Sequence, residues 1–175
     1  IILCFTTKSH AQVTPPQIWN SIIRLEASDW LTNSEKLQKA DSLKLLMDEK
    51  KFAQDSVYAR ILHRIAVLKY LLNGAIATQE SIDYTIHAVQ INNSGKHGAS
   101  PYFAVNSYIN LGGYFESIGY YRKAYLYYDS AMLLNKHKFL SHPMAPLCFT
   151  NKAIIGFKLG DYQKSIEDCS KGIEE

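Results

Sequence analysis

Apolar side chains recur every three or four residues along most of this chain, which is the spacing of amphipathic α-helices. Two of the clearest stripes consist of Ile61, Ile65, Leu68 and Leu72, and of Tyr108, Leu111, Phe115 and Ile118. The pattern predicts helices over about residues 17–27, 34–50, 55–72, 78–92, 101–118 and 121–135, and a further helical pair over 143–175. Helices separated by short polar breaks predict an all-α fold of antiparallel helical hairpins.

Three pairs of small residues mark the second helix of three successive hairpins. The pairs are Ser81 with Ala88, Ala124 with Ala131, and Ser165 with Gly172. Members of a pair are seven residues apart, which is two helical turns and therefore one helix face. Both members advance by 43 residues and then by 41. We therefore expect one close helix–helix contact to be built three times, as in an α-solenoid.

Glycine and proline residues mark the ends and starts of the predicted helices. Asn73-Gly74, Gly119 and Gly160-Asp161-Tyr162 end the first helices, and Ser100-Pro101 begins one with a capping residue and a proline in the first turn. The polar run 92–98 predicts a loop. After Gly74 the first hairpin reads Ile76-Ala77-Thr78, without the turn glycine and tyrosine of the other two. The sequence therefore leaves the geometry of that turn open.

One segment of the chain matches a known repeat. Leu111-Gly112 with Phe115, followed by Gly119-Tyr120-Tyr121, Ala124, Tyr128 and Ala131, resembles the tetratricopeptide repeat. A second copy is similar at Gly160-Asp161-Tyr162, Ser165, Ile166, Cys169 and Gly172, and a weaker one at Leu68, Leu72, Ser81, Thr85 and Ala88. The resemblance implies a right-handed α-solenoid with repeats over about 55–93, 100–136 and 143–175, after an N-terminal helical cap region at 12–54. Gly112 is then a close-packing position like the three small pairs.

The resemblance further implies a concave groove, lined by the first helix of each hairpin, that binds a peptide or a partner domain. The residues it places there are Ala66, Tyr70, Ile109, Asn110, Gly113, Thr150, Asn151 and Ile154. Side-chain amides such as those of Asn110 and Asn151 can hydrogen-bond an extended peptide backbone. The alternative is that these residues simply face solvent. The lysine clamp with which some family members hold C-terminal carboxylates has no counterpart at these positions.

The two ends of the sequence suggest a segment of an exported protein. The apolar run 1–5 followed by Ser9-His10-Ala11 resembles the end of a bacterial secretory signal, which predicts a signal-peptide remnant at 1–11 and export to the periplasm. A short buried strand or a disordered start is the alternative. Glu175 lies within a helical pattern, so we expect the repeats to be truncated there. The stretch from 55–60 to 95–100 is also similar to the N-terminal repeats of exported bacterial proteins that carry a caspase-like CHAT domain or a sensor kinase.

Charge and hydropathy exclude two classes of partner. The formal net charge is +3, with both signs mixed along the chain, and no basic stripe with interleaved aromatic residues occurs, which argues against nucleic acid. No stretch approaches the ~20 apolar residues of a membrane span. A terminal repeat without a polar cap exposes apolar surface, so self-association through it is expected.

No pattern typical of catalysis or metal binding occurs in the sequence. The six histidines form neither HExxH nor a zinc-type pairing with cysteine, Leu111-Gly112-Gly113 falls inside a helical stripe, and Glu116, Asp129 and Asp161 have no carboxylate partner. We therefore expect no catalytic residue, no metal and no cofactor, and a scaffold that binds a protein or peptide. The alternatives are the sensing or docking arm of a larger effector, such as a CHAT peptidase or a histidine kinase, and an enzyme in its own right, for which no residue can be named.

Two cysteines lie in the last hairpin. Cys148 and Cys169 occur on its two antiparallel helices, and an exported protein permits a disulfide between them. Cys169 falls at the position of Tyr128 and Thr85 in the other repeats, which is a packing position. Two buried, unreactive thiols are therefore the favoured interpretation.

Overall fold

The computed structural model describes residues 15–134 and 144–174, which contain eight helices and no strand. The helices are α1 (Pro15–Glu26), α2 (Asn33–Glu49), α3 (Ser56–Leu72), α4 (Gln79–Asn92), α5 (Pro101–Ser117), α6 (Tyr121–Leu133), α8 (Ala145–Lys158) and α9 (Tyr162–Glu174). The all-α expectation is therefore confirmed, with the expected bounds of the first six helices within two residues of those observed. The expected signal remnant at 1–11, the end of the second repeat at residue 136 and Glu175 lie outside the described residues.

Side-chain caps fix where helices begin. The carboxylate of Asp55 accepts hydrogen bonds from the backbone N–H groups of Val57 at 2.9 Å and Tyr58 at 3.3 Å, which starts α3. At the start of α2, Thr32 and Glu35 each accept a hydrogen bond from the other's backbone N–H, forming a capping box. A cap of this kind contributes about 1 kcal/mol by pairing backbone donors that the helix leaves free.

The three hairpin turns close in the same way. In each, the residue after a glycine donates its backbone N–H to the carbonyl five residues earlier, from Ala75 to Tyr70, Tyr120 to Phe115 and Asp161 to Gly156, at 2.8–3.0 Å. The glycines, Gly74, Gly119 and Gly160, have φ between +66° and +80°, where a side chain is disfavoured. A glycine at each of these three turns accommodates the positive φ at little cost.

The first hairpin does have a turn glycine, which corrects the expectation that it lacks one. Gly74 takes this role seven residues before Ser81, whereas Gly119 and Gly160 come five residues before Ala124 and Ser165. Ala75 also has a positive φ, of 59°. The turn is the same, and the connection to α4, residues 73–78, is three residues longer than the connections 118–120 and 159–161.

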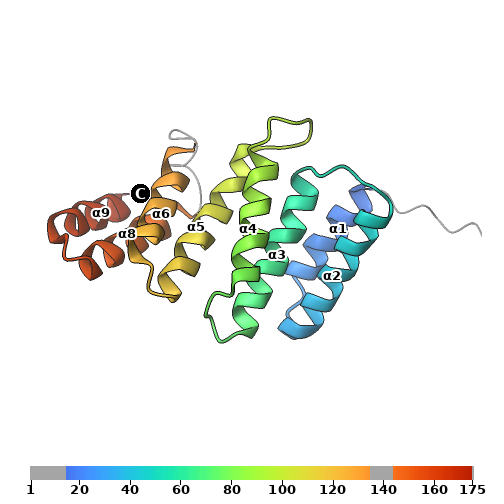
Figure 1. Ribbon diagram of the computed structural model, residues 1–175, viewed down its shortest axis with the longest axis horizontal. Coiled ribbons are helices and arrows are strands. Elements are labelled where there is room, and N and C mark those ends of the chain that lie inside the picture. The colour runs from blue at the N-terminus through green and yellow to red at the C-terminus, as the bar shows by residue number, and fades with distance from the viewer. Residues whose placement is uncertain (1–14, 135–143, 175) are drawn as a thin grey trace, which may run out of the picture.

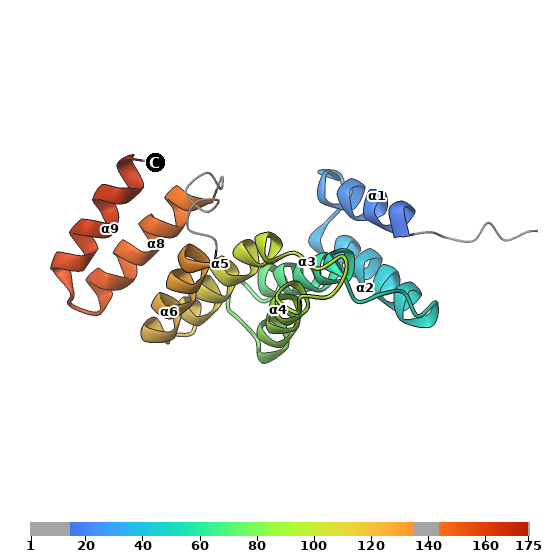
Figure 2. The same ribbon diagram turned by 90° about the horizontal axis from the view of Figure 1, so that it is seen from above.

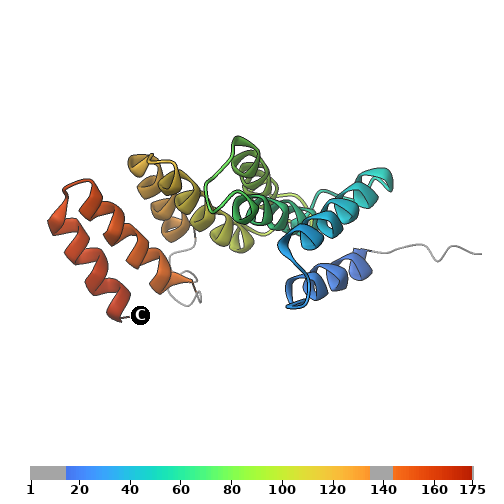
Figure 3. The same ribbon diagram turned by 90° about the horizontal axis from the view of Figure 1, so that it is seen from below.

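Consecutive helices lie side by side in one curved row. Figure 1 shows the row running from α1 and α2 at one end to α8 and α9 at the other. Figures 2 and 3, which view the molecule from above and from below, show that the row is bent. The inner side of the bend consists of α1, α3, α5 and α8, and the outer side consists of α2, α4, α6 and α9. None of the described helices combines the length and apolar character that crossing a bilayer requires.

The small residues lie at helix contacts of differing depth. Ser81, Ala88, Ala124 and Ala131 are fully buried. Ser165 and Gly172 are half-buried, and both face α8. The hydroxyl of Ser165 donates to the carbonyl of Ala153, and a Cβ built on Gly172 would lie 3.1 Å from the Cβ of Phe149.

Gly112 makes the closest approach between α5 and α6. A Cβ built on it would lie 2.6 Å from two ring carbons of Tyr128, whereas a Cβ on Gly113 would meet only the Tyr128 hydroxyl, at 3.8 Å. The ring of Tyr128 therefore crosses α5 through the space that Gly112 leaves, and its hydroxyl reaches the inner side of the row.

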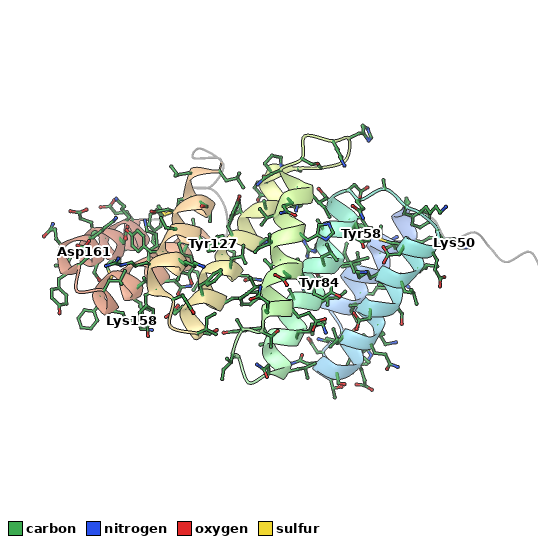
Figure 4. All side chains as sticks on the ribbon, in the orientation of Figure 1. Lys50, Tyr58, Tyr84, Tyr127, Lys158 and Asp161 are labelled. Carbon is green, nitrogen blue, oxygen red and sulfur yellow. The ribbon has the colours of Figure 1, made fainter. Side chains whose placement is uncertain are left out.

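A buried ionic cluster joins the last hairpin to α6. The ammonium of Lys152 lies 2.6 Å from Asp129 and 3.5 Å from Asp168, and 4.6 Å above the ring of Tyr125. The hydroxyl of Tyr125 donates to Asp168 at 3.0 Å. In contrast Lys158, labelled in Figure 4 at the far end of α8, pairs with Glu116 at the surface.

Both cysteines of this hairpin are free thiols, and only one is buried. Cys148 lies beneath Tyr128 and directs its sulfur at that residue's carbonyl at 3.6 Å. Cys169 is exposed, which corrects the expectation of two buried thiols. The equivalent Tyr128 and Thr85 are buried because α8 and α5 pack beside α6 and α4, and among the described residues no helix packs on that face of α9.

Candidate functional site

A hollow of about 200 Å³ opens between α3, α5 and α8, the three neighbouring helices of the inner side. We call it the inner groove, and its lining residues are Val67, Tyr70, Leu71, Ile109, Asn110, Gly113, Tyr114, Tyr128, Met144, Leu147 and Asn151. Most of its wall is apolar or aromatic. Polar groups come from two carboxamides and three phenol hydroxyls, and none of the lining residues carries a charge at neutral pH.

Five of the eight residues that the resemblance placed in a groove line this one hollow: Tyr70, Ile109, Asn110, Gly113 and Asn151. The other three do not. Ala66 is fully buried in the core, so its position is one of packing. Thr150 is exposed and its hydroxyl is bonded to the carbonyl of Pro146 at 2.9 Å. Ile154 is also exposed, outside the hollow.

Two tyrosines that the sequence did not place in the groove form part of its lining. Tyr114 and Tyr128 are buried, and their hydroxyl oxygens have no hydrogen-bond partner. Burial raises the pKa of both phenols well above the ordinary value, with only partial offsets from Thr85 and Asn151, so both hydroxyls keep their protons. The position of Tyr128 in the repeat pattern predicts that its ring packs between helices, but it does not predict where its hydroxyl group lies.

Asn110 is held in place from behind by His63 of α3. The Nδ2 group of Asn110 lies 3.2 Å from Nε2 of His63, and Nδ1 of His63 lies 2.9 Å from the Ser107 hydroxyl. An amide N–H can only donate, so Nε2 accepts and the imidazole is neutral with its proton on Nδ1. The carboxamide of Asn110 therefore presents its oxygen and second N–H in a fixed orientation.

The His63 imidazole resists protonation. Burial, followed by the charges of Arg64 and Arg60, lowers its pKa from 6.5 to about 4, against a smaller opposing effect of Glu26. Protonation would turn the acceptor Nε2 into a donor and remove the hydrogen bond from Asn110.

Acidification is therefore expected to destabilise the fold through His63. Because the pKa in the folded chain lies below that in the unfolded chain, the unfolded chain takes up a proton first as the pH falls through 6.5 towards 4. We expect a loss of about 1–2 kcal/mol of unfolding free energy between about pH 7 and pH 5. Urea denaturation of the wild type and of His63→Gln at both values measures it. Equal pH dependence in the two proteins would contradict this role of His63.

A second hollow, of about 120 Å³, lies on the other side of His63 and is lined by polar side chains of α1, α3, α4 and α5. There Glu26 pairs with both Arg60 and Arg64. Burial alone would raise the pKa of Glu26, but the hydrogen bonds and charges of the two arginines lower it overall. These ion pairs fasten α1 to α3. Among the described residues no cluster of histidine, cysteine and carboxylate side chains could hold a metal ion.

Comparison with known proteins yields neither a protein-family model nor a curated protein that matches this chain.

Proposed function

We propose that this chain is a tetratricopeptide-like, right-handed α-solenoid that acts as a non-enzymatic scaffold and binds a protein or peptide in its inner groove. The three equivalent glycine turns, the buried small residues and the alternation of inner and outer helices support the repeat assignment. The function itself is inferred from the groove.

The observation that carries the proposal is the convergence of Asn110 and Asn151 on one apolar hollow. They come from equivalent helices, α5 and α8, and lie 41 residues apart, so the repeat itself places one carboxamide at each position. Carboxamides both donate and accept, and this matches the alternating N–H and C=O groups of an extended peptide. The apolar wall supplies burial for side chains of the bound segment.

Selection from a displayed library of random peptides on the immobilised protein tests this proposal. We expect enriched peptides to bind the wild type and to bind Asn110→Ala with Asn151→Ala about tenfold more weakly, the equivalent of roughly 1.4 kcal/mol of lost hydrogen bonding. Thr150→Ala is the matched control, because Thr150 is exposed on the same helix as Asn151 and lies outside the groove.

Failure to enrich any peptide, or equal affinity for the wild type and the double variant, would contradict peptide binding in the inner groove.

A second candidate is a docking arm for an effector in the periplasm, such as a CHAT peptidase or a histidine kinase. It is favoured by the outer face of α9, where Ile166 is 62% and Ile173 86% exposed. Tyr125 and Met132 occupy the equivalent positions of α6, where Tyr125 is buried and Met132 half-buried, with α8 packed beside α6. An exposed apolar face of this kind could pack against a further helix or against a second copy of the chain. Self-association through this face stays a prediction. An effector domain encoded after Glu175 would support this candidate, and a stop codon there would reject it.

A further inference from the structure

We infer that the inner groove selects an uncharged peptide segment that places one hydrogen-bonding side chain, an amide or a hydroxyl, against the hydroxyls of Tyr114 and Tyr128. The inference rests on the proposed function and specifies its ligand. Three buried side-chain atoms lack a hydrogen-bond partner among the described residues: Asn106 Oδ1, Tyr114 Oη and Tyr128 Oη. The last two belong to the groove.

An unpartnered buried hydroxyl is unfavourable, because the group has given up water without a replacement. Phenylalanine would fill the same space without that penalty. Two such hydroxyls in one hollow therefore indicate that a partner is brought there from outside.

The polar neighbours of both hydroxyls leave them free. The Thr85 hydroxyl, near Tyr114, donates its own proton to the carbonyl of Ser81 at 2.9 Å, so it could only accept from Tyr114, and the two hydroxyls do not form that hydrogen bond. Asn151 lies beside Tyr128 but does not complete a hydrogen bond with it. One ligand group that both donates and accepts, such as a carboxamide or hydroxyl, could pair with these phenols.

The backbone of α5 places no side chain between the Tyr128 hydroxyl and the groove at Gly113. Gly112 allows its ring to pass, and a Cβ on Gly113 would stand 3.8 Å from its hydroxyl, so the glycine at that position leaves the approach clear. The hydroxyl oxygen is buried in the unbound chain, so a ligand side chain entering between Asn110 and Asn151 must shift other lining side chains to meet it, but it displaces none at Gly113.

Charge in and around the groove excludes an ionic ligand group. No lining residue could neutralise a buried carboxylate or ammonium group. Burial is the main cause that raises the pKa of Tyr70 and Tyr128, and the Glu116 carboxylate raises both further, so its field reaches the groove and repels an anion. Glu116 is itself paired with Lys158 at 2.8 Å, and Arg64, whose charge reaches Tyr114, is paired with Glu26.

The volume of the hollow limits the size of the ligand group that can enter it. At about 200 Å³ it is smaller than the ~300 Å³ at which pockets for drug-sized molecules begin. It suits one inserted side chain with the adjoining peptide backbone on Asn110 and Asn151.

Peptides enriched from the displayed library on the wild-type protein provide the test. We expect them to share an uncharged core containing Asn, Gln, Ser or Thr, and to bind Tyr114→Phe and Tyr128→Phe about tenfold more weakly than the wild type. The free variants should melt at the same temperature as the wild type or higher, since each loses an unpartnered hydroxyl. Tyr108→Phe is the control, because its hydroxyl already pairs with Asn93 outside the groove.

Different outcomes separate the ligand class from the function. If enriched peptides depend on Asn110 and Asn151 but have charged or wholly apolar cores, or bind both Phe variants as well as the wild type, the inference is wrong and groove binding stands. If no peptide depends on the groove residues, both are wrong. A lower melting temperature with unchanged peptide affinity would assign the hydroxyls to the fold and overturn the inference.

Discussion

Replacing Lys152 with methionine is expected to lower the free energy of unfolding by about 3–5 kcal/mol, the largest effect of any substitution considered. Lys152 is 5% exposed and Asp168 3% exposed, so the variant leaves a buried carboxylate facing Asp129 without its cation. Methionine retains most of the volume, so the loss reports the charge and not a cavity. Denaturant unfolding followed by circular dichroism measures it.

Lys158→Met is the matched control, since it removes the same charge from the same helix. Lys158 is 38% exposed where it pairs with Glu116, and exposed pairs contribute about 0–1 kcal/mol. Adding Asp168→Asn to Lys152→Met should restore part of the stability, because the amide carbonyl still accepts from Tyr125 without a charge. A loss below about 1 kcal/mol in Lys152→Met would show that the cluster does not join the last hairpin to α6.

Gly112→Ala is expected to cost about 2–3 kcal/mol, although alanine favours a helix over glycine by up to about 1 kcal/mol. The added methyl group would lie 2.6 Å from the ring of Tyr128, which is fully buried and has no free space beside it. Either α5 and α6 separate or the ring turns, and both disturb the contact between the second hairpin's helices. Thermal and urea denaturation measure the loss.

The neighbouring glycine provides the comparison. Gly113→Ala adds the same methyl group at 3.8 Å from the Tyr128 hydroxyl, an ordinary contact, so we expect unchanged or slightly higher stability from the gain in helix propensity. If the two alanine variants were equally stable, the close approach at Gly112 would not be a determinant of the fold.

The helices could be predicted from the sequence because their apolar stripes, caps and turn glycines are local signals. Asp55 and Ser100-Pro101 marked helix starts within a residue. The prediction that the turn between α3 and α4 lacks a glycine was wrong, and the reason is also local. Its glycine, Gly74, stands two residues farther from Ser81 than the repeat spacing suggests, and spacing counted from the small residues could not show it.

The site could be predicted only in part, because groove residues depend on the depth at which each helix packs. The family resemblance placed Asn110 and Asn151 on the inner face, but it could not show that Ala66 lies beneath that face in the core. The exposure of Cys169 likewise depends on which helix covers α9. The unpartnered hydroxyls of Tyr114 and Tyr128 could not be predicted, because they depend on how the helices pack in three dimensions. The ring of Tyr128, from α6, reaches the groove only by crossing α5 at Gly112.

Under the proposed function, Tyr128 ties ligand recognition to the packing of α5 against α6. Its ring fills the space beside Gly112, and its buried hydroxyl ends at the lining of the inner groove. A substitution of this side chain that changes ligand specificity would also change the packing of α5 against α6. If the groove binds peptides as proposed, we expect specificity to change at positions such as Leu147 and Asn151, which line the groove without packing between α5 and α6.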